Sequence, residues 1–236
     1  MLQLRSRDEI ARADAGWLRA RHHFAIGPYG NPAHKPVGNL IVFNDDEIQA
    51  HAGFPLHHHA NIEIVTYVHD GTITHRDDQG NVGAIHAGDV QAMSAGTGIR
   101  HSERNDEDSP ARLFQIWLTP KVSGGVPNWG NKPFPKADRA GRIVVLASGR
   151  NAEGALPIRA DAEVTGAMLL TDTETTYTFD SGDVGYLVAA TGELEVSGLP
   201  VVAREGLVIK NETAIAIKAY QDSEIVLVVT AGTGRA

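Results

Sequence analysis

Histidine is the residue in this chain whose distribution points most directly to chemistry. All eleven histidines lie within the first 101 residues, and the second half has none. Two short segments concentrate them: His57, His58 and His59 precede Glu63, and His101 precedes Glu103 just after a glycine-rich turn. Because imidazole and carboxylate groups are the usual ligands of transition metals in proteins, the first half is expected to carry any such site.

The spacing within these segments predicts which side chains meet. Alternate residues of a β-strand share a face, so His57, His59 and Glu63 are expected on one face, and His101 with Glu103 on another. Two such strands facing a barrel interior can surround one ion with three imidazoles and a carboxylate. This set of nitrogen and oxygen ligands suits a divalent transition metal, whereas calcium and magnesium prefer oxygen alone.

A second interpretation of the same residues needs no metal. The run from His57 to His59 can form a polar surface loop, with His101 an unrelated core or turn residue. Two His-containing segments with ligand spacing favour the metal site over this alternative. By the same alternation His58 points away from the ion, and its exclusion tests the argument.

Composition excludes several classes of function. With no cysteine among 236 residues, disulfides, thiolate metal sites, iron–sulfur clusters and cysteine nucleophiles are excluded. A formal net charge of −8 argues against direct nucleic-acid binding, which needs clustered positive charge. The N-terminal segment carries charges from Arg5 onward, without the apolar stretch of a secretory signal, and no apolar run approaches a membrane span. A cytoplasmic protein without membrane contact is expected.

The hydrophobic pattern predicts an all-β protein. Short segments rich in Val, Ile, Thr, Tyr and Phe alternate with Gly, Asp and Asn, and helical periodicity over 10–15 residues is missing. Clear strand candidates span residues 40–44, 62–69, 112–118, 142–146, 166–170, 185–189 and 224–230. The Pro- and Gly-rich stretch 119–142 has a linker's composition and no expected strand. We therefore predict two small β-barrels in tandem, over residues 1–130 and 131–236.

Several motifs together resemble one known family. They comprise Gly53-Phe54-Pro55 through Glu63, Thr66-Tyr67-Val68, His75-Arg76-Asp77, Gly88-Asp89-Val90-Gln91, Met93 through Glu103, and Gln115-Ile116-Trp117. This set is similar to the pirin family of bicupins, and most of all to its bacterial branch of quercetin 2,3-dioxygenases. The resemblance is dense over residues 16–118 and thin after the linker. It implies two cupin-type (jelly-roll) barrels, of which only the first holds a metal.

Residue by residue, the resemblance implies His57, His59, His101 and Glu103 as metal ligands. Glu63 stands where ordinary cupins place their carboxylate ligand, so it is expected to support the site or to replace Glu103. The chain departs from the family pattern at His58, where proline is usual, and at Ala60-Asn61.

The resemblance also implies a function. It predicts a metal-dependent dioxygenase that cleaves a flavonol such as quercetin with O2. A carboxylate beside the ion can accept the proton of the substrate hydroxyl, and we assign this role of catalytic base to Glu103. Fe(II) is the expected cofactor, with Ni, Cu, Mn, Co or Zn as alternatives. A metal- or redox-sensing regulatory protein of the pirin type, without turnover and with a protein partner, is the competing hypothesis. A monomer is expected.

Other conspicuous residues are expected to be structural. Met93, Phe114 and Trp117 are assigned to the barrel core, where large apolar side chains are usual, with the lining of the ligand cavity as the alternative for each. His22 and Phe24 lie on the same side of an expected strand, and packing is the default role for both.

Overall fold

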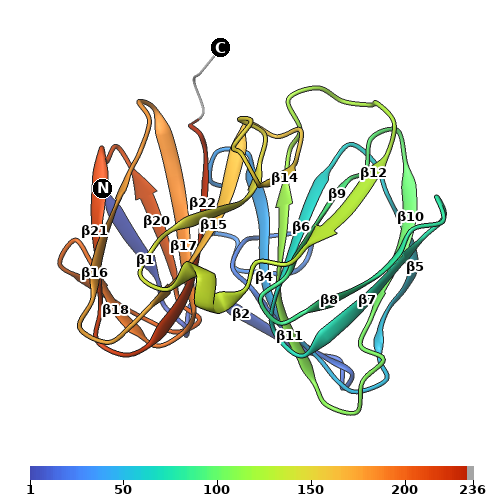
Figure 1. Ribbon diagram of the computed structural model, residues 1–236, viewed down its shortest axis with the longest axis horizontal. Helices are drawn as coiled ribbons and strands as arrows, with labels where there is room; N and C mark the ends of the chain where they lie inside the picture. Colours follow the sequence, from blue (N-terminus) through green and yellow to red (C-terminus); the bar gives the residue numbers. More distant parts are fainter. Residues whose placement is uncertain (233–236) are drawn as a thin grey trace.

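The fold was analysed in a computed structural model, which describes residues 1–232. Within this range the chain forms 22 β-strands and one short 3-10 helix, η1 (Lys136–Arg139). The strands build four sheets, two in each half of the molecule (Figure 1). The expectation of an all-β protein is confirmed.

The first barrel combines a seven-stranded and a four-stranded sheet. Its strands are β2 (Ala11–Asp14), β3 (Leu18–His22), β4 (Leu40–Ile48), β5 (Gly53–His59), β6 (Glu63–Asp70), β7 (Thr72–Asp77), β8 (Val82–His86), β9 (Val90–Ser94), β10 (Ile99–Arg104), β11 (Ala111–Leu118) and β12 (Asn128–Lys132). The large sheet has the order β12-β9-β6-β11-β4-β3-β2, and the small sheet has the order β5-β10-β7-β8. Every pair in these two sheets is antiparallel.

The second barrel repeats this plan. Its strands are β1 (Leu2–Arg5), β13 (Val144–Ser148), β14 (Leu156–Pro157), β15 (Ala162–Leu169), β16 (Glu174–Thr178), β17 (Asp183–Thr191), β18 (Glu193–Val196), β19 (Leu199–Val202), β20 (Gly206–Lys210), β21 (Ala214–Ala219) and β22 (Ser223–Ala231). The large sheet runs β1-β20-β17-β22-β15-β13-β14, and the small one runs β16-β21-β18-β19.

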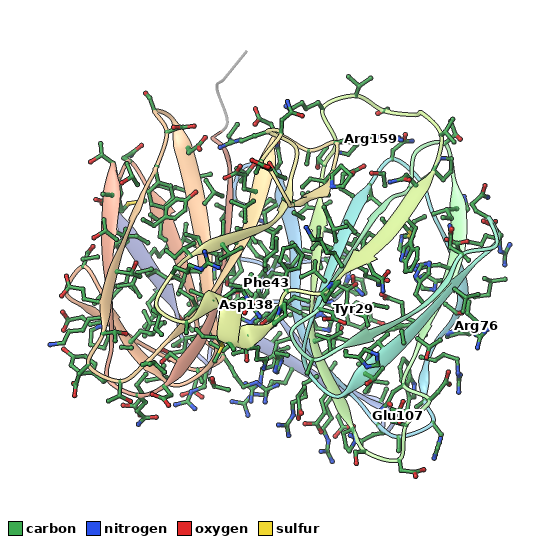
Figure 2. All side chains as sticks on the ribbon, in the orientation of Figure 1. Tyr29, Phe43, Arg76, Glu107, Asp138 and Arg159 are labelled. Carbon is green, nitrogen blue, oxygen red and sulfur yellow. The ribbon has the colours of Figure 1, made fainter. Side chains whose placement is uncertain are left out.

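The two seven-stranded sheets pack face to face. One apolar cluster joins residues of both halves, so each large sheet buries its outer face against the other. Phe43 of β4 is fully buried there, with its ring 4.9 Å from that of Phe114 and 5.6 Å from that of Tyr186 in the second half. Figure 2 shows Phe43 in the middle of the molecule, between the two halves. The interface is therefore a shared hydrophobic core.

The interiors of the two barrels differ in polarity. The second barrel is filled by apolar side chains such as Leu187, Ile217 and Leu227. The first barrel also buries polar groups on its inner face, among them Gln91 and Glu103. Buried polar groups need hydrogen-bond partners, so they mark the first interior as the place for polar chemistry.

The stretch 119–142 differs from the expected linker. It contains β12, which pairs with the edge strand β9, and the helix η1. Strand propensity is low in this stretch, but the unpaired backbone groups of an edge strand can still recruit a neighbouring segment. The expectation that the stretch 119–142 contains no strand was therefore wrong.

The division into residues 1–130 and 131–236 stays a prediction, and two elements cross it. Strand β1 lies at the start of the chain but pairs with β20 of the second barrel. Strand β12 runs through residue 130. The chain therefore enters the first barrel only after contributing a strand to the second.

Among the described residues, no helix has the length and apolar character that crossing a membrane requires.

We predict that Phe43→Ala lowers the free energy of unfolding by about 3–5 kcal/mol, because it leaves a cavity in the core shared by both halves. Urea denaturation followed by fluorescence and by far-UV circular dichroism should show one shared transition at lower urea. Val122, whose side chain is 75% exposed, supplies the control, since Val122→Ala should change stability by less than about 0.5 kcal/mol. Two separate transitions in the Phe43→Ala variant would contradict a core common to both barrels.

Candidate metal centre

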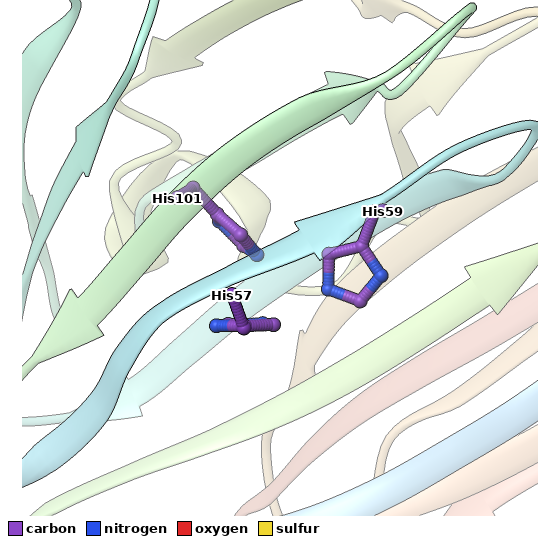
Figure 3. Close-up of side chains that lie close together, drawn as sticks. All are labelled: His57, His59 and His101. Carbon is purple, nitrogen blue, oxygen red and sulfur yellow. The ribbon is translucent and has the colours of Figure 1, made fainter.

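Strands β5 and β10 bring three histidines together. Their antiparallel register sets His101 directly opposite His57, and His59 lies two residues further along β5 on the same face. The ring centroid of His57 lies 4.5 Å from that of His101 and 4.7 Å from that of His59, and the His59 and His101 centroids are 5.1 Å apart. Figure 3 shows the three rings gathered on one side of the two strands.

His58 lies on the opposite face of β5. Its side chain is exposed and lies against Gly98 on the neighbouring turn. A Cβ atom added to this glycine would lie only 2.8 Å from His58 Nε2. The structure therefore separates His58 from the other two histidines of the run, as the alternation of side chains predicts.

Glu63 does not share the face of His57 and His59, so this expectation was wrong. The chain turns after β5, where Asn61 adopts a positive φ of 55°, and Glu63 begins the next strand, β6. Its Oε2 accepts hydrogen bonds from Ser94 Oγ at 2.6 Å and from the backbone N–H of Arg159 at 2.8 Å. The carboxylate thus ties the first barrel to the second, and the turn breaks the alternation that the sequence suggested.

The three histidines fit a divalent metal. Each offers a ring nitrogen, and these nitrogens all lie within 4.8 Å of one another. His57 Nδ1 lies 2.8 Å from the carbonyl oxygen of Pro55, and donating to it leaves Nε2 free as a ligand. His101 Nε2 is buried without a hydrogen-bond partner in the protein. A metal ion would satisfy this nitrogen, since buried polar atoms are otherwise paired.

The electrostatics of the cluster favour neutral rings. Burial, with smaller contributions from His101 and His57, lowers the pKa of His59 to about 4. Burial also lowers the pKa of His101 to about 3, and His57 and His75 add to this shift. Metals bind the unprotonated imidazole, so near neutral pH no proton competes for these two sites.

Glu103 is buried and held by three side-chain donors. Thr66 Oγ1 donates to Oε1 at 3.0 Å, Gln91 Nε2 donates to the same oxygen, and Gln115 Nε2 donates to Oε2 at 2.6 Å. Glu103 belongs to a second potential ligand group, with His75 and His101, whose ligand atoms also lie within 4.8 Å of one another. His101 is thus common to both groups, and Glu103 approaches the three-histidine cluster from the His101 side.

A carboxylate and a second imidazole support His101. Asp77 Oδ2 lies 3.2 Å from His75 Nε2, and His75 Nδ1 lies 3.5 Å from His101 Nδ1, a long contact. The ring of His75 stacks on Trp129 with centroids 4.6 Å apart and an interplanar angle of 13°. This arrangement fixes the ring plane of His75 and leaves His101 Nε2 directed to the cluster.

The cluster opens into a pocket of about 330 Å³, within the range typical of small-molecule sites. Its walls include the apolar side chains of Phe54, Ile64 and Trp117 together with Tyr29. Trp117 packs against the core cluster of Ile64 and Met93 as expected, and it also lines the pocket, with its ring 5.0 Å from that of His59. Met93 and Phe114 are buried in the core as expected.

The pair His22 and Phe24 is divided by the structure. His22 lines the pocket, where its Nδ1 lies 3.1 Å from Asn44 Oδ1. Phe24 is buried in the core between the halves, with its ring 4.8 Å from that of Tyr186. Packing is therefore the role of Phe24 alone.

Asp46 also lines the pocket, and its role was not foreseen from the sequence. The residue is 1% exposed, and its Oδ1 has no hydrogen-bond partner in the protein. Burial raises the pKa of this carboxyl well above its usual range, and the nearby Asp45 and Glu103 add to the effect. A protonated Asp46 can donate a hydrogen bond into the pocket.

Sequence reasoning missed the polar residues that surround Glu103. Thr66, Gln91 and Gln115 stand on strands whose neighbouring positions are apolar and buried. A polar residue at a core position of a strand is a recognisable signal, since its burial requires a specific partner. The identity of that partner depends on which strands pair, and this is set by the fold.

Comparison with known proteins agrees with this architecture. The family model named Pirin matches residues 3–118, and the model of the quercetinase C-terminal cupin domain matches residues 145–228. The pirin-like protein of Caulobacter vibrioides is 52% identical over 97% of this chain and 99% of its own length. The quercetin 2,3-dioxygenase of Escherichia coli K12 is 36% identical over 96% of this chain and 97% of its own length.

A solved structure extends the comparison. The bacterial pirin YhhW from Escherichia coli, in complex with nickel(II), matches with a TM-score of 0.92 and 34% identity, over 99% of this chain and all of that chain. The expectation of two cupin-type barrels in tandem is confirmed. On the evidence of both family models and of relatives that match along nearly their whole length, the chain belongs to the pirin family.

Proposed function

We propose that this protein is a metal-dependent dioxygenase that acts on a flavonol-like aromatic substrate such as quercetin. The observation that carries the proposal is the convergence of His57, His59 and His101 beneath a pocket with apolar and aromatic walls. The name of the Escherichia coli relative, quercetin 2,3-dioxygenase, supports the reaction class and the substrate.

The proposed metal ligands are His57, His59 and His101, with Glu103 completing the set. We propose Fe(II) as the ion, because imidazole and carboxylate ligands with an open position are typical of non-haem Fe(II) oxygenases, while the nickel(II) in the YhhW structure shows that a relative accepts another divalent ion. When bound, the metal supplies Lewis acidity that lowers the pKa of a coordinated substrate hydroxyl and supports the reaction with O2.

Glu103 is the proposed general base. Its two oxygens are held by Thr66, Gln91 and Gln115, so the carboxylate has a fixed position on the edge of the pocket. A carboxylate within reach of the substrate hydroxyl can take up its proton, which leaves an electron-rich enolate. Preorganisation of this kind reduces the reorganisation needed when charge develops.

The pocket walls would orient the substrate. Trp117 and Phe54 offer flat surfaces to an aromatic ring, and aromatic pairs of this kind contribute about 0.5–1.5 kcal/mol beyond the burial of area. A protonated Asp46 supplies a donor for a substrate oxygen on the His22 and Asn44 side of the pocket. The apolar side chains of Phe54, Ile64 and Trp117 would reduce the access of water to the reacting groups.

The competing function is a regulatory binding protein of the pirin type that binds metal without turnover. Both functions use the same ligands, so metal binding alone does not separate them. Oxygen uptake by the iron-loaded protein with quercetin does, because only the dioxygenase consumes O2 in step with substrate. The cytoplasmic location, the monomeric state and a protein partner stay predictions from the sequence.

We predict that His59→Ala lowers metal affinity at least tenfold, since it removes one of three converging imidazoles. His58→Ala is the matched control and should retain full occupancy, because His58 is exposed on the opposite face of β5. The measurement is the number of metal ions per chain, by elemental analysis of protein purified without a histidine tag. Equal loss of metal in both variants would contradict the alternation on which the ligand assignment depends.

We predict that Glu103→Gln lowers turnover per bound metal about 100-fold or more, because the amide cannot accept the substrate proton. Glu63→Gln is the control. Glu63 is as buried as Glu103, at 1% against 2% exposure, but its carboxylate contacts Ser94 and Arg159. This second variant should lose stability rather than turnover, which is measured as oxygen uptake divided by metal content.

Two outcomes of these measurements would contradict the proposal. If Glu63→Gln abolishes turnover at full occupancy while Glu103→Gln leaves it intact, Glu103 is not the base. If iron-loaded native protein takes up no oxygen with quercetin, the proposed dioxygenase function is wrong and the regulatory alternative is favoured.

A further inference from the structure

A second pocket, separate from the metal centre, lies on the outer face of the β2-β3-β4 edge. Its volume is about 280 Å³, and four arginines line it: Arg12 of β2, Arg19 and Arg21 of β3, and Arg204 from the turn between β19 and β20 of the second barrel. Such clustering is unexpected in a chain with a net charge of −8. The pocket is built by both halves of the molecule.

Strand alternation separates this pocket from the metal centre. On β3 and β4, the side chains of His22, Asn44 and Asp46 face the barrel interior. Their neighbours along the strands, Arg21 and Asp45, face outward. The same two strands therefore direct some of their polar side chains to the metal centre and the alternate ones to the arginine pocket.

The strand register places like charges side by side. Arg12 and Arg21 are direct cross-strand partners in the β2-β3 pair. Like charges directly opposite each other destabilise a sheet. An anion bound between the two guanidinium groups would attract both of them and offset their mutual repulsion.

Arg21 lacks a full set of partners. Its side chain is only 17% exposed, and its Nη1 is buried without a hydrogen-bond partner. Its Nε lies 4.0 Å from Asp45 Oδ2, but that oxygen already accepts a hydrogen bond from Arg204 Nε at 2.5 Å. Burial lowers the pKa of Arg21 below its usual range, and Arg204 and Arg12 add to this shift.

The acidic residues of the pocket pair with Arg19 and Arg112 rather than with Arg12 or Arg21. Glu47 accepts hydrogen bonds from Arg19 and from Arg112, each at 3.0 Å, and Asp14 lies 3.6 Å from Arg19. Arg12 has only a 3.8 Å contact with Asp8, in which both side chains are exposed, and such pairs contribute little. Arg12 and Arg21 are thus the guanidinium groups with capacity for an additional anion.

We propose that this pocket binds a multivalent oxyanion of the phosphoryl class, with Arg12 and Arg21 as its principal ligands and Arg204 as a third. A phosphoryl group carries up to two negative charges and three oxygens, so it can serve several guanidinium groups at once, often in a bidentate manner. A single carboxylate offers two oxygens and one charge, which is fewer than this set of donors can use.

The test is isothermal titration calorimetry with pyrophosphate and the metal-loaded full chain at low ionic strength. Arg12→Gln should weaken binding at least tenfold, and because Arg12 is exposed this variant should fold normally. Arg21→Gln should also weaken binding at least tenfold, and thermal melting verifies that this variant is folded. The matched control is Arg76→Gln, an exposed arginine of β7 at the outer edge of the first barrel (Figure 2), which should bind like the native chain.

Two further arms identify the site and the ligand class. Pyrophosphate can also bind a metal, so the His59→Ala chain should retain native affinity for pyrophosphate if the arginine pocket is the site. Malonate, a dicarboxylate, should bind more weakly than pyrophosphate. The proposal is overturned if pyrophosphate does not bind, if Arg12→Gln binds like native protein, if His59→Ala abolishes binding, or if malonate binds more tightly.

Discussion

The pairing of β5 with β10 is the interaction on which the proposed metal centre depends. Its register sets His57 opposite His101, and the alternation of side chains then brings His59 to the same face. A shift of one residue would bring His58 to this face and expose the other two, because the period of a strand is two residues. The register changes only after His101: Glu103 lies opposite Phe54, so β5 has one more residue than β10 between the two pairs, which is a bulge in β5. Bulges of this kind redirect side chains and are common beside functional sites.

The seven-stranded sheet of the first barrel supports this pairing by using its two faces differently. Its outer face, with Phe43 and Phe114, packs against the second barrel and is apolar. Its inner face supplies the donors of Thr66, Gln91 and Gln115 that hold Glu103. Burial of the outer face stabilises the sheet, and the hydrogen bonds of the inner face fix the carboxylate. The second barrel thus contributes to the site through the stability of the sheet rather than through a ligand.

The sequence predicts the local part of this arrangement well, because alternation is a property of each strand. The shared face of His57 and His59, and the exclusion of His58, needed only this rule. Glu63 shows where the rule ends: a turn at Asn61 separates it from β5, and such a turn is weakly encoded where no glycine or proline marks it. Trp117, Asp46 and β12 depend on which strands become neighbours, and β1 depends on a pairing across more than 200 residues. Such long-range choices are decided by tertiary packing, which no local pattern contains.

The central claim is that one ion binds where His57, His59 and His101 converge. Anomalous diffraction from crystals of the iron- or nickel-loaded protein, measured at the absorption edge of the metal, locates the ion directly. We expect one peak at about 2.0–2.3 Å from a nitrogen of each of the three histidines, with Glu103 on its remaining side. A peak held by His75, His101 and Glu103, without His57 and His59, would contradict the account, because the second ligand group would then be the metal centre.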